Sequence, residues 1–172
     1  MRFTGGLDNY GSVAVTAGIN NLRGDITNYG GGKLTVTGGA QAVFYDDIVQ
    51  NGTLRVAKVG STTSTAVFLG AFTGNGGTTG GGDIFFEGDL RPGNSPANVT
   101  FANNVGLGGE ATTIIELAGA TSGQFDQINV TGGLSLDGVL SVFLLGSFTP
   151  TAGNSFDILN WGSIDGTFAS LQ

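Results

Sequence analysis

Three stretches of the chain repeat one pattern, and this pattern decides the fold class. They read NYGSVAV at residues 9–15, NYGGGKLTV at residues 28–36 and NGTLRV at residues 51–56. Each opens on asparagine and glycine, which suit sharp corners, and each ends in apolar residues that alternate with polar or small ones. Alternation of this kind is typical of a short strand with one buried face. The sequence therefore predicts short strands separated by corners.

The spacing of these stretches predicts a parallel β-helix. Their first apolar residues, Val13, Leu34 and Leu54, are 21 and 20 residues apart. A repeat of roughly 20 residues built from short strands has the size of one β-solenoid coil, and coils stack about 4.8 Å apart. We therefore expect the three residues to form one internal column. The alternative is a β-sandwich, whose hairpins favour Asn-Gly turns, and such pairs occur at 51–52 and 75–76.

Glycine content and strand length divide the predicted solenoid into three sections. Residues 1–73 carry the regular coils, and residues 74–82, which read GNGGTTGGG, predict a glycine-rich loop or wide corner. From 83 to 172 the predicted strands are longer and more aromatic, as in the alternating run at 134–145. We expect this section to continue the same sheets as a wider or capping part of a single β-solenoid domain.

Composition excludes several classes of function. The chain has no cysteine and no histidine, which rules out disulfides, zinc sites and Ser-His-Asp or Cys-His catalysis. Charged residues make up 11%, less than half of the roughly 25% of ordinary soluble domains. The first 91 residues hold seven acidic and six basic side chains, whereas the remainder holds six acidic and no basic ones. Nucleic acid and anionic membranes are therefore not expected as partners, and no apolar run has the length of a membrane-spanning helix.

Parallel β-helices include polysaccharide lyases, so carboxylates near a basic residue have to be considered. The candidates in the regular coils are Asp46, Asp47, Arg55 and Lys58. Neighbouring residues on a strand point to opposite faces, so Asp46 and Asp47 would not share a site. We interpret all four as solvated surface charges. The sequence thus predicts no catalytic residue, no cofactor and no metal site.

A second acidic group and a threonine pair carry weaker hypotheses. Asp83, Glu87 and Asp89 are spaced by four and two residues, so on one strand they would line a single face and could hold a hard cation. The simpler interpretation is a polar outer face, because no calcium-loop motif accompanies them. Thr35 and Thr37 form a T-x-T pair of the kind found on ice-binding solenoids. Neighbouring coils do not repeat the pair, so ice binding is not expected.

Three stretches in the second half of the chain have the form of known surface-protein motifs. They read GDLRPGNSP at 88–96, FDQINVTGGLSL at 125–136, and GSFTPTAGNSFDIL at 146–159 followed by GTF at 166–168. They resemble the G-x-L-x-P-G-x-S-P turn, a strand pair and the terminal block of bacterial autotransporter-type β-helix passengers and of proteins that bear a PEP-CTERM sorting signal. The resemblance implies an extracellular β-helix. The sorting tail and a translocator barrel are absent from this chain, so the resemblance does not indicate how it is anchored.

These patterns together predict an extracellular or cell-surface structural or adhesive module that is not an enzyme. The end segments 3–7 and 166–172 lack a polar capping element. Solenoid ends without caps expose unpaired backbone groups, so we expect self-association into a homo-oligomer, a filament or a surface layer. The alternative function is a carbohydrate-binding or polysaccharide-degrading β-helix, with cell-surface polysaccharide as its partner.

Overall fold

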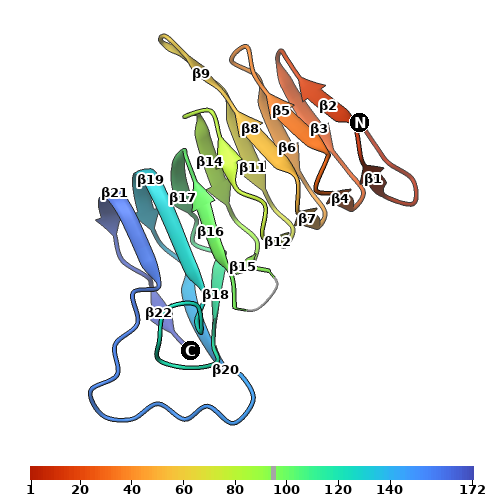
Figure 1. The fold of residues 1–172 in the computed structure, drawn as a ribbon. Helices are drawn as coiled ribbons and strands as arrows, with labels where there is room; N and C mark the ends of the chain where they lie inside the picture. Colours follow the sequence, from red (N-terminus) through yellow and green to blue (C-terminus); the bar gives the residue numbers. More distant parts are fainter. Residues whose placement is uncertain (94–95) are drawn as a thin grey trace.

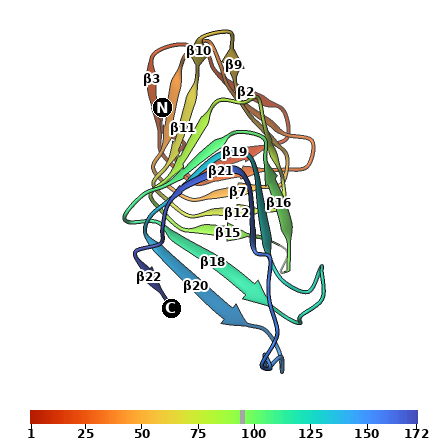
Figure 2. The same cartoon turned by 90° about the vertical axis from the view of Figure 1, so that its left-hand side faces the viewer.

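Strands and corners alternate along the chain and wind into a parallel β-solenoid (Figure 1). The computed structural model describes residues 1–93 and 96–172, and no helix occurs among them. Each regular coil contributes one strand to each of three faces. Figure 2, which views the stack from its C-terminal end, shows these faces enclosing the core.

The first face is an 8-stranded sheet within the described residues. In spatial order it contains β1 (Leu7–Asn9), β4 (Ile26–Asn28), β7 (Ile48–Gln50), β12 (Phe72–Gly74), β15 (Leu90–Pro92), β18 (Thr112–Leu117), β20 (Val139–Leu144) and β22 (Ser170–Leu171). All neighbouring strands in this sheet run parallel.

The second and third faces form one 12-stranded sheet in the part of the chain that is described. The second face carries β2 (Ser12–Val15), β5 (Lys33–Val36), β8 (Thr53–Val56), β13 (Thr78–Thr79) and β16 (Asn98–Phe101). The third face carries β3 (Ile19–Leu22), β6 (Gln41–Phe44), β11 (Thr65–Phe68), β14 (Asp83–Phe86) and β17 (Asn104–Leu107). The two faces join because β19 (Gln127–Leu136) pairs with both β16 and β17, and β21 (Leu159–Gly166) pairs along β19.

Strand register confirms the predicted internal column. Val13 pairs with Leu34, and Leu34 pairs with Leu54, in parallel strands of the second face. The fold is therefore a parallel β-helix, and the β-sandwich alternative is wrong. The same column continues in later coils through Thr78, Phe101, Val130 and Trp161.

Aromatic rings fill the middle of the solenoid. Phe44, Phe68 and Phe86 succeed one another on the third face, with ring centroids 4.8 and 5.2 Å apart and at most 2% of each residue exposed. Phe72 and Phe101 pack edge-on against Phe86 from the other two faces. Stacking occurs because the coil spacing of about 4.8 Å matches the separation of packed rings. Truncating one of these rings to alanine costs about 3–5 kcal/mol.

A ladder of amide side chains closes the first corner of the N-terminal coils. Asn9 Nδ2 donates to Asn28 Oδ1 at 2.7 Å, and Asn28 Nδ2 donates to Gln50 Oε1 at 2.9 Å. These three residues are at most 5% exposed. An amide both donates and accepts, so it can repeat in successive coils and satisfy its neighbours inside the core. The ladder ends at Gly74 of the next coil, and Gln50 Nε2 has no hydrogen-bond partner among the described residues.

The glycine-rich stretch 74–82 is not the uninterrupted loop that its composition predicts. Thr78 and Thr79 form β13, which pairs with β8 and β16. Thr78 is 2% exposed, and its hydroxyl donates to Asn103 Oδ1 at 2.6 Å. At Gly76 an added Cβ would lie 2.5 Å from the carbonyl oxygen of Gly52. Glycine is needed here for close approach between coils rather than for flexibility, which is why composition alone was misleading.

Two features depart from the regular coils. β9 (Lys58–Val59) and β10 (Thr62–Thr63) form an antiparallel hairpin that projects between β8 and β11 (Figure 1). In the C-terminal coils the strands lengthen, to six residues in β18 and β20, ten in β19 and eight in β21. Of the turn predicted at 88–96, Asn94 and Ser95 lie outside the described residues.

Candidate functional site

Asp46 and Asp47 lie exposed in the corner between β6 and β7, in line with their interpretation as solvated surface charges of a turn. Asp46 Oδ2 accepts a hydrogen bond from the Gly24 amide at 2.7 Å, and Asp47 Oδ1 accepts one from the Ala71 amide at 2.9 Å. Gly24 belongs to the preceding corner of the stack and Ala71 to the following one. The two carboxylates therefore bind the backbones of adjacent coils and stabilise the column of corners.

Asp83, Glu87 and Asp89 do not line one face, which corrects the second hypothesis from the sequence. Asp83 begins β14 on the third face, and the corner at Gly88 carries Asp89 to the first face just before β15. Within residues 1–93 and 96–172, no group of three or more Asp, Glu, His or Cys side chains is placed to hold a metal ion. Asp83 instead takes part in a groove described below.

The other sequence candidates lie apart from one another. Arg55 occupies β8 on the second face, and Lys58 lies in the projecting hairpin. Thr35 pairs with Ala14 on one side and Arg55 on the other, so the threonine array is broken as the sequence predicts. The ring of Tyr45 lies beneath the guanidinium of Arg23, with 3.8 Å between Cζ of Arg23 and the ring centroid.

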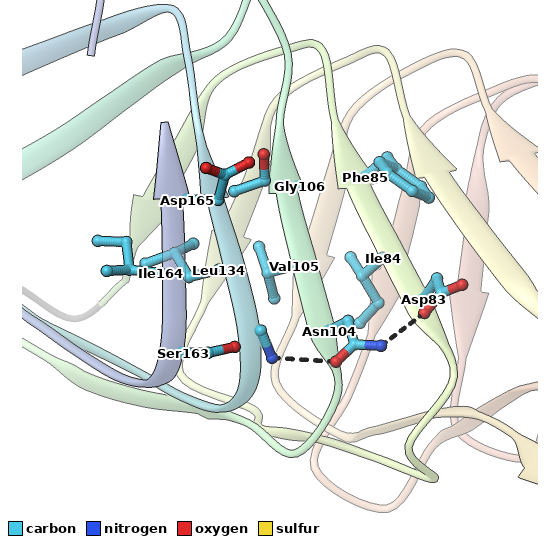
Figure 3. Close-up of a pocket in the computed structure, with 12 residues that line it drawn as sticks. Asp83, Ile84, Phe85, Asn104, Val105, Gly106, Leu134, Ser163, Ile164 and Asp165 are labelled. Atoms are coloured by element: carbon cyan, nitrogen blue, oxygen red, sulfur yellow. Dashed lines mark hydrogen bonds between the residues drawn. The ribbon is translucent and has the colours of Figure 1, made fainter. Parts of the chain in front are cut away.

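A groove crosses the outer side of the third face (Figure 3). Its volume is about 340 Å³, and it passes over β14, β17, β19 and β21. Because it crosses the strands, it runs along the solenoid axis. The backbone of inward-facing residues forms its floor, and outward-facing side chains form its two sides. The first side holds Asp83, Asn104, Gly133 and Ser163, and the second holds Phe85, Gly106, Ser135 and Asp165.

Phe85 is the large apolar side chain of the groove and is 43% exposed. Its ring leans across the neighbouring strand and covers Gly106. A Cβ added at Gly106 would lie 2.6 Å from Cδ1 and 2.9 Å from Cε1 of this ring. Any residue other than glycine at 106 would therefore displace the ring. Gly106 lets Phe85 rest against the sheet while much of its surface stays open to solvent.

Hydrogen bonds fix the polar side of the groove. Asn104 Nδ2 donates to Asp83 Oδ1 at 2.9 Å, and the Gly133 amide donates to Asn104 Oδ1 at 3.0 Å, as the dashed lines in Figure 3 show. Asn104 is thus held from both neighbouring strands. Across the floor, Ser135 and Asp165 are paired in register on β19 and β21. The lining contains two carboxylates and no basic side chain, so its charge is negative.

The N-terminal end of the solenoid is a second candidate surface. There β1, β2 and β3 each pair along one edge with the next coil. Tyr10 is 67% exposed, although its ring stacks on Tyr29 with centroids 4.2 Å apart and planes 8° from parallel. An apolar depression at this end is lined by Val13, Val15, Leu22, Leu34, Thr35, Val36 and Phe44.

The C-terminal end exposes large apolar residues from inward-facing columns. Leu144, Trp161 and Leu171 are 51, 47 and 75% exposed. They pair with Leu117, Val130 and Leu140, respectively, of the preceding coil. In earlier coils such positions are covered by the following coil. The end therefore presents an apolar surface where another layer of strands would fit.

Asp126 is a buried carboxylate that binds backbone rather than a ligand. It is 0% exposed and accepts hydrogen bonds from the amides of Ala97 at 2.6 Å and Glu116 at 2.8 Å. Burial raises the pKa of this carboxyl above its usual range, against the opposing effect of the two N–H donors. Asp126 thus joins three segments of the wide coils. Sequence reasoning did not single out Asp126, which appeared there only as part of the stretch 125–136.

Sequence reasoning missed the groove because it depends on which strands become neighbours. Asp83 and Phe85 alternate on one strand, and Asn104 and Gly106 alternate on another, 21 residues later. This offset equals the first spacing of the repeat at Val13 and Leu34. Extending that period into the second half of the chain would have placed Phe85 beside Gly106.

Comparisons with known proteins add no relative. No protein-family model matches the chain, and no curated protein or solved structure matches it either. In the described part of the chain, no helix has the length and apolar character needed to cross a membrane.

Proposed function

We propose that this chain is a non-catalytic structural module of the cell exterior that assembles head to tail. The C-terminal end of one copy would stack on the N-terminal end of the next. The observation that carries the proposal is a single internal column that begins at Val13 and ends at Trp161. Val13 and Trp161 are the first and last members of this column, and each brings an apolar side chain to its end of the stack.

Apolar surface at both ends supports the contact. Trp161 is 47% exposed at one end, and Val13 borders the apolar depression at the other. Stacking in register would bring Trp161 of one copy onto Val13 of the next. Burying such surface contributes about 25 cal/mol per Å².

Strand edges at the two ends also correspond. β21 has eight residues and follows both the second and the third face, because it pairs along the bent β19. β2 and β3 provide four residues each on the same two faces at the other end. Free edges of this kind favour pairing with another chain. A contact between unlike ends does not close on itself and produces filaments.

Charge favours joining unlike ends over joining two C-terminal ends. The first coils carry Arg2 and Arg23 balanced by Asp8 and Asp25, whereas β21 carries Asp165 and is preceded by Asp157. The chain beyond residue 91 contains no basic side chain. Two acidic C-terminal ends would repel each other, whereas the balanced charges of the N-terminal coils oppose no contact with an acidic end. The small charged fraction of 11% leaves little general repulsion to oppose assembly.

Extracellular placement is part of the proposal. Support comes from the low charge and from the resemblance of the stretches at 88–96, 125–136 and 146–159 to bacterial surface-protein motifs. Asp46, Asp47, Asp83 and Asp126 each accept hydrogen bonds within the structure. These carboxylates thus already have a structural role, which agrees with a non-catalytic module.

Complementary variants blocked at one end test the head-to-tail contact. We expect the native chain to form oligomers whose size rises with concentration in analytical ultracentrifugation. Val13→Asp blocks the N-terminal end and Trp161→Asp blocks the C-terminal end. Each variant alone should be monomeric, because its one remaining end finds only blocked partner ends on the other copies. An equimolar mixture of the two should give a heterodimer.

Substitutions at outward-facing positions beside Val13 and Trp161 serve as matched controls. Ala14→Asp and Asn160→Asp change the adjacent outward-facing positions and should leave assembly intact. A native chain that stays monomeric at all concentrations and salt levels would contradict the proposal. If Val13→Asp still assembles while Trp161→Asp does not, the contact joins two C-terminal ends and the head-to-tail arrangement is wrong.

A further inference from the structure

We propose that the groove on the third face binds a neutral polysaccharide chain. The inference concerns a side face of the solenoid and does not depend on head-to-tail assembly. It rests on three properties of the groove: an exposed aromatic ring, a rim of fixed hydrogen-bonding groups, and negative charge without a basic residue. A sugar chain is the ligand whose chemistry meets all three.

The aromatic ring supplies the apolar contact. Sugar rings have apolar C–H faces that pack on aromatic side chains, and Phe85 offers a ring that is 43% exposed. Gly106 fixes how far this ring leans over the sheet, since a Cβ at that position would lie 2.6 Å from Cδ1. Binding sites for small ligands combine such apolar surface with a few well-placed polar groups.

The rim supplies hydrogen-bond partners for hydroxyl groups. Asn104 is held by Asp83 and by the Gly133 amide, so its orientation is set before a ligand arrives. Ser135 and Asp165 face it across the floor. Carboxylate oxygens accept strong hydrogen bonds from hydroxyl donors, and a serine hydroxyl both donates and accepts. Preorganised partners reduce the entropy lost on binding.

Charge selects among polysaccharides. The lining includes Asp83 and Asp165 but no lysine or arginine. An anionic polymer would meet repulsion there, without a cation to offset it. A neutral chain keeps the apolar contact and the hydrogen bonds without that repulsion.

Shape agrees with a linear ligand. The groove crosses four strands along the solenoid axis, and its volume of about 340 Å³ is near the lower limit of small-ligand sites. Adjacent strands lie about 4.8 Å apart, so the four strands span about 14 Å. A chain of a few sugar units fits this track and can continue beyond both ends.

A competing occupant is the projecting hairpin of a second copy. Val59 is 64% exposed at its tip, and Lys58 could approach the carboxylates of the groove. We favour the sugar chain because the rim offers more hydrogen-bond acceptors than one lysine can use. The hairpin is kept as a distinguishable outcome of the test.

Isothermal titration calorimetry with defined oligosaccharides tests the proposal. The probes are cellohexaose, maltohexaose and chitohexaose as neutral chains, with hexagalacturonate as the anionic chain. We expect at least one neutral probe to bind with a dissociation constant of about 1 mM or below, and hexagalacturonate not to bind. Trp161→Asp, which blocks assembly in the proposal above, should bind the same probe equally well.

Groove variants then locate the site. Phe85→Ala should weaken binding about tenfold, which corresponds to about 1.4 kcal/mol. Gly106→Ala should weaken it as well, because the added Cβ displaces the ring without removing it. Leu69→Ala, an exposed apolar residue outside the groove, is the matched control and should bind normally. Circular dichroism confirms that each variant is folded.

Several results would overturn the inference. One is failure of all three neutral probes to bind at about 10 mM, well above the expected dissociation constant. Another is binding that Phe85→Ala and Gly106→Ala leave unchanged. A third is loss of self-association in both Phe85→Ala and Lys58→Glu without any sugar binding, which would assign the groove to the hairpin of another copy.

Discussion

The N-terminal and C-terminal coils differ in how they build the corner between the first and second faces. In the first coils the corner is tight, and buried amides at positions 9, 28 and 50 hydrogen-bond from coil to coil. In the last coils the strands reach six to ten residues, and the corner opens into the loop at 145–158. A ladder of buried amides links the narrow coils, whereas the wide coils have longer strands and the buried carboxylate of Asp126.

This difference makes the two ends of the molecule unlike. The narrow end shows a tyrosine stack and an apolar depression, and the wide end shows Leu144, Trp161 and Leu171. A solenoid with identical ends could stack in either sense. Unlike ends define a direction, and the distribution of charge along the chain reinforces it. The predictions below test how strongly each region depends on its own kind of contact.

The largest effect is expected from a charge in the internal column. Leu34 is 3% exposed and lies between Val13 and Leu54. Leu34→Asp buries an unpaired carboxylate, which costs about 3–5 kcal/mol and is a large part of the 5–15 kcal/mol that holds a typical domain folded. We expect the N-terminal coils to unfold, as seen by loss of the β signal in circular dichroism and by proteolysis.

The neighbouring position provides the control for this variant. Thr35 points outward on the same strand, so Thr35→Asp adds the same charge to solvent. Its effect on the free energy of unfolding should stay within about 0.5 kcal/mol. Equal destabilisation by both variants would show that the strand as a whole, rather than the column, is sensitive to charge.

The amide ladder is expected to have the next largest effect. Asn28→Ala removes the middle member, so Gln50 Oε1 loses its donor inside the core, whereas Asn9 Nδ2 keeps the Lys33 carbonyl as an acceptor at 3.2 Å. Unsatisfied buried polar groups cost about 1–3 kcal/mol each. Urea denaturation should show a loss of this size.

An external ladder in the wide coils gives the matched comparison. Asn129 Nδ2 donates to Asn98 Oδ1 at 2.6 Å, and Asn160 Nδ2 donates to Asn129 Oδ1 at 3.0 Å, on the solvent side. Water can replace these bonds, so Asn129→Ala should cost about 0.5 kcal/mol or less. Similar losses for Asn28→Ala and Asn129→Ala would refute the role that we give to burial.

Local patterns in the sequence were sufficient to predict the fold class. The alternation at 12–15, 33–36 and 53–56 and its spacing predicted the parallel register of three strands, and that register is confirmed. The stretch 74–82 was predicted as a loop or wide corner, and the short strand β13 within it was missed, because a glycine required by close contact cannot be told from a flexible one in sequence. Asp46 and Asp47 lie in an exposed corner, in line with their interpretation as solvated surface charges.

The same reasoning relates Phe85 to Gly106 through the 21-residue period but does not predict the whole groove. It requires side chains from four strands that span residues 83 to 165, and the coil length varies in between. Register between distant strands depends on every corner, so small errors in corner length accumulate. The amide ladder was missed for a related reason. Asn9 and Asn28 were interpreted as corner residues, whereas their side chains turn inward and meet Gln50.

Stability near the wide coils should depend on pH through Asp126. Burial raises the pKa of this carboxyl in the folded state above its ordinary value of 3.8. The folded state therefore binds the proton more tightly, and the contribution to stability is fully present below pH 3.8 and is lost as pH rises through the folded-state pKa. In urea titrations between acidic and neutral pH, Asp126→Asn should remove this component.

Comparing the pH profiles of variants isolates the effect, because other carboxylates titrate in the same range. The quantity to follow is the difference in unfolding free energy between the native chain and each variant. For Asp126→Asn this difference should change with pH, because burial raises the pKa of this carboxyl. If the difference in unfolding free energy for Asp126→Asn did not change with pH, burial would not raise the pKa of this carboxyl.

The smallest effect concerns the tyrosine stack at the narrow end. A hydrogen bond with Tyr10, together with the nearby charge of Asp8, raises the pKa of Tyr29 from 10.0 to about 12. The neutral phenol is therefore favoured by folding, and the associated stability is present below pH 10 and is lost as pH rises toward 12.

Tyr10→Phe keeps the stacked ring but removes the hydroxyl, so the pKa of Tyr29 should fall toward 10.0. NMR of chains carrying 13C-labelled tyrosine can follow Tyr29 alone, and Tyr29→Phe identifies its resonance. Asp8→Asn should lower the pKa less than Tyr10→Phe does, because the hydrogen bond is the larger cause. If Tyr10→Phe leaves the pKa near 12, the two rings do not share a hydrogen bond, and the narrow end is organised by ring stacking alone.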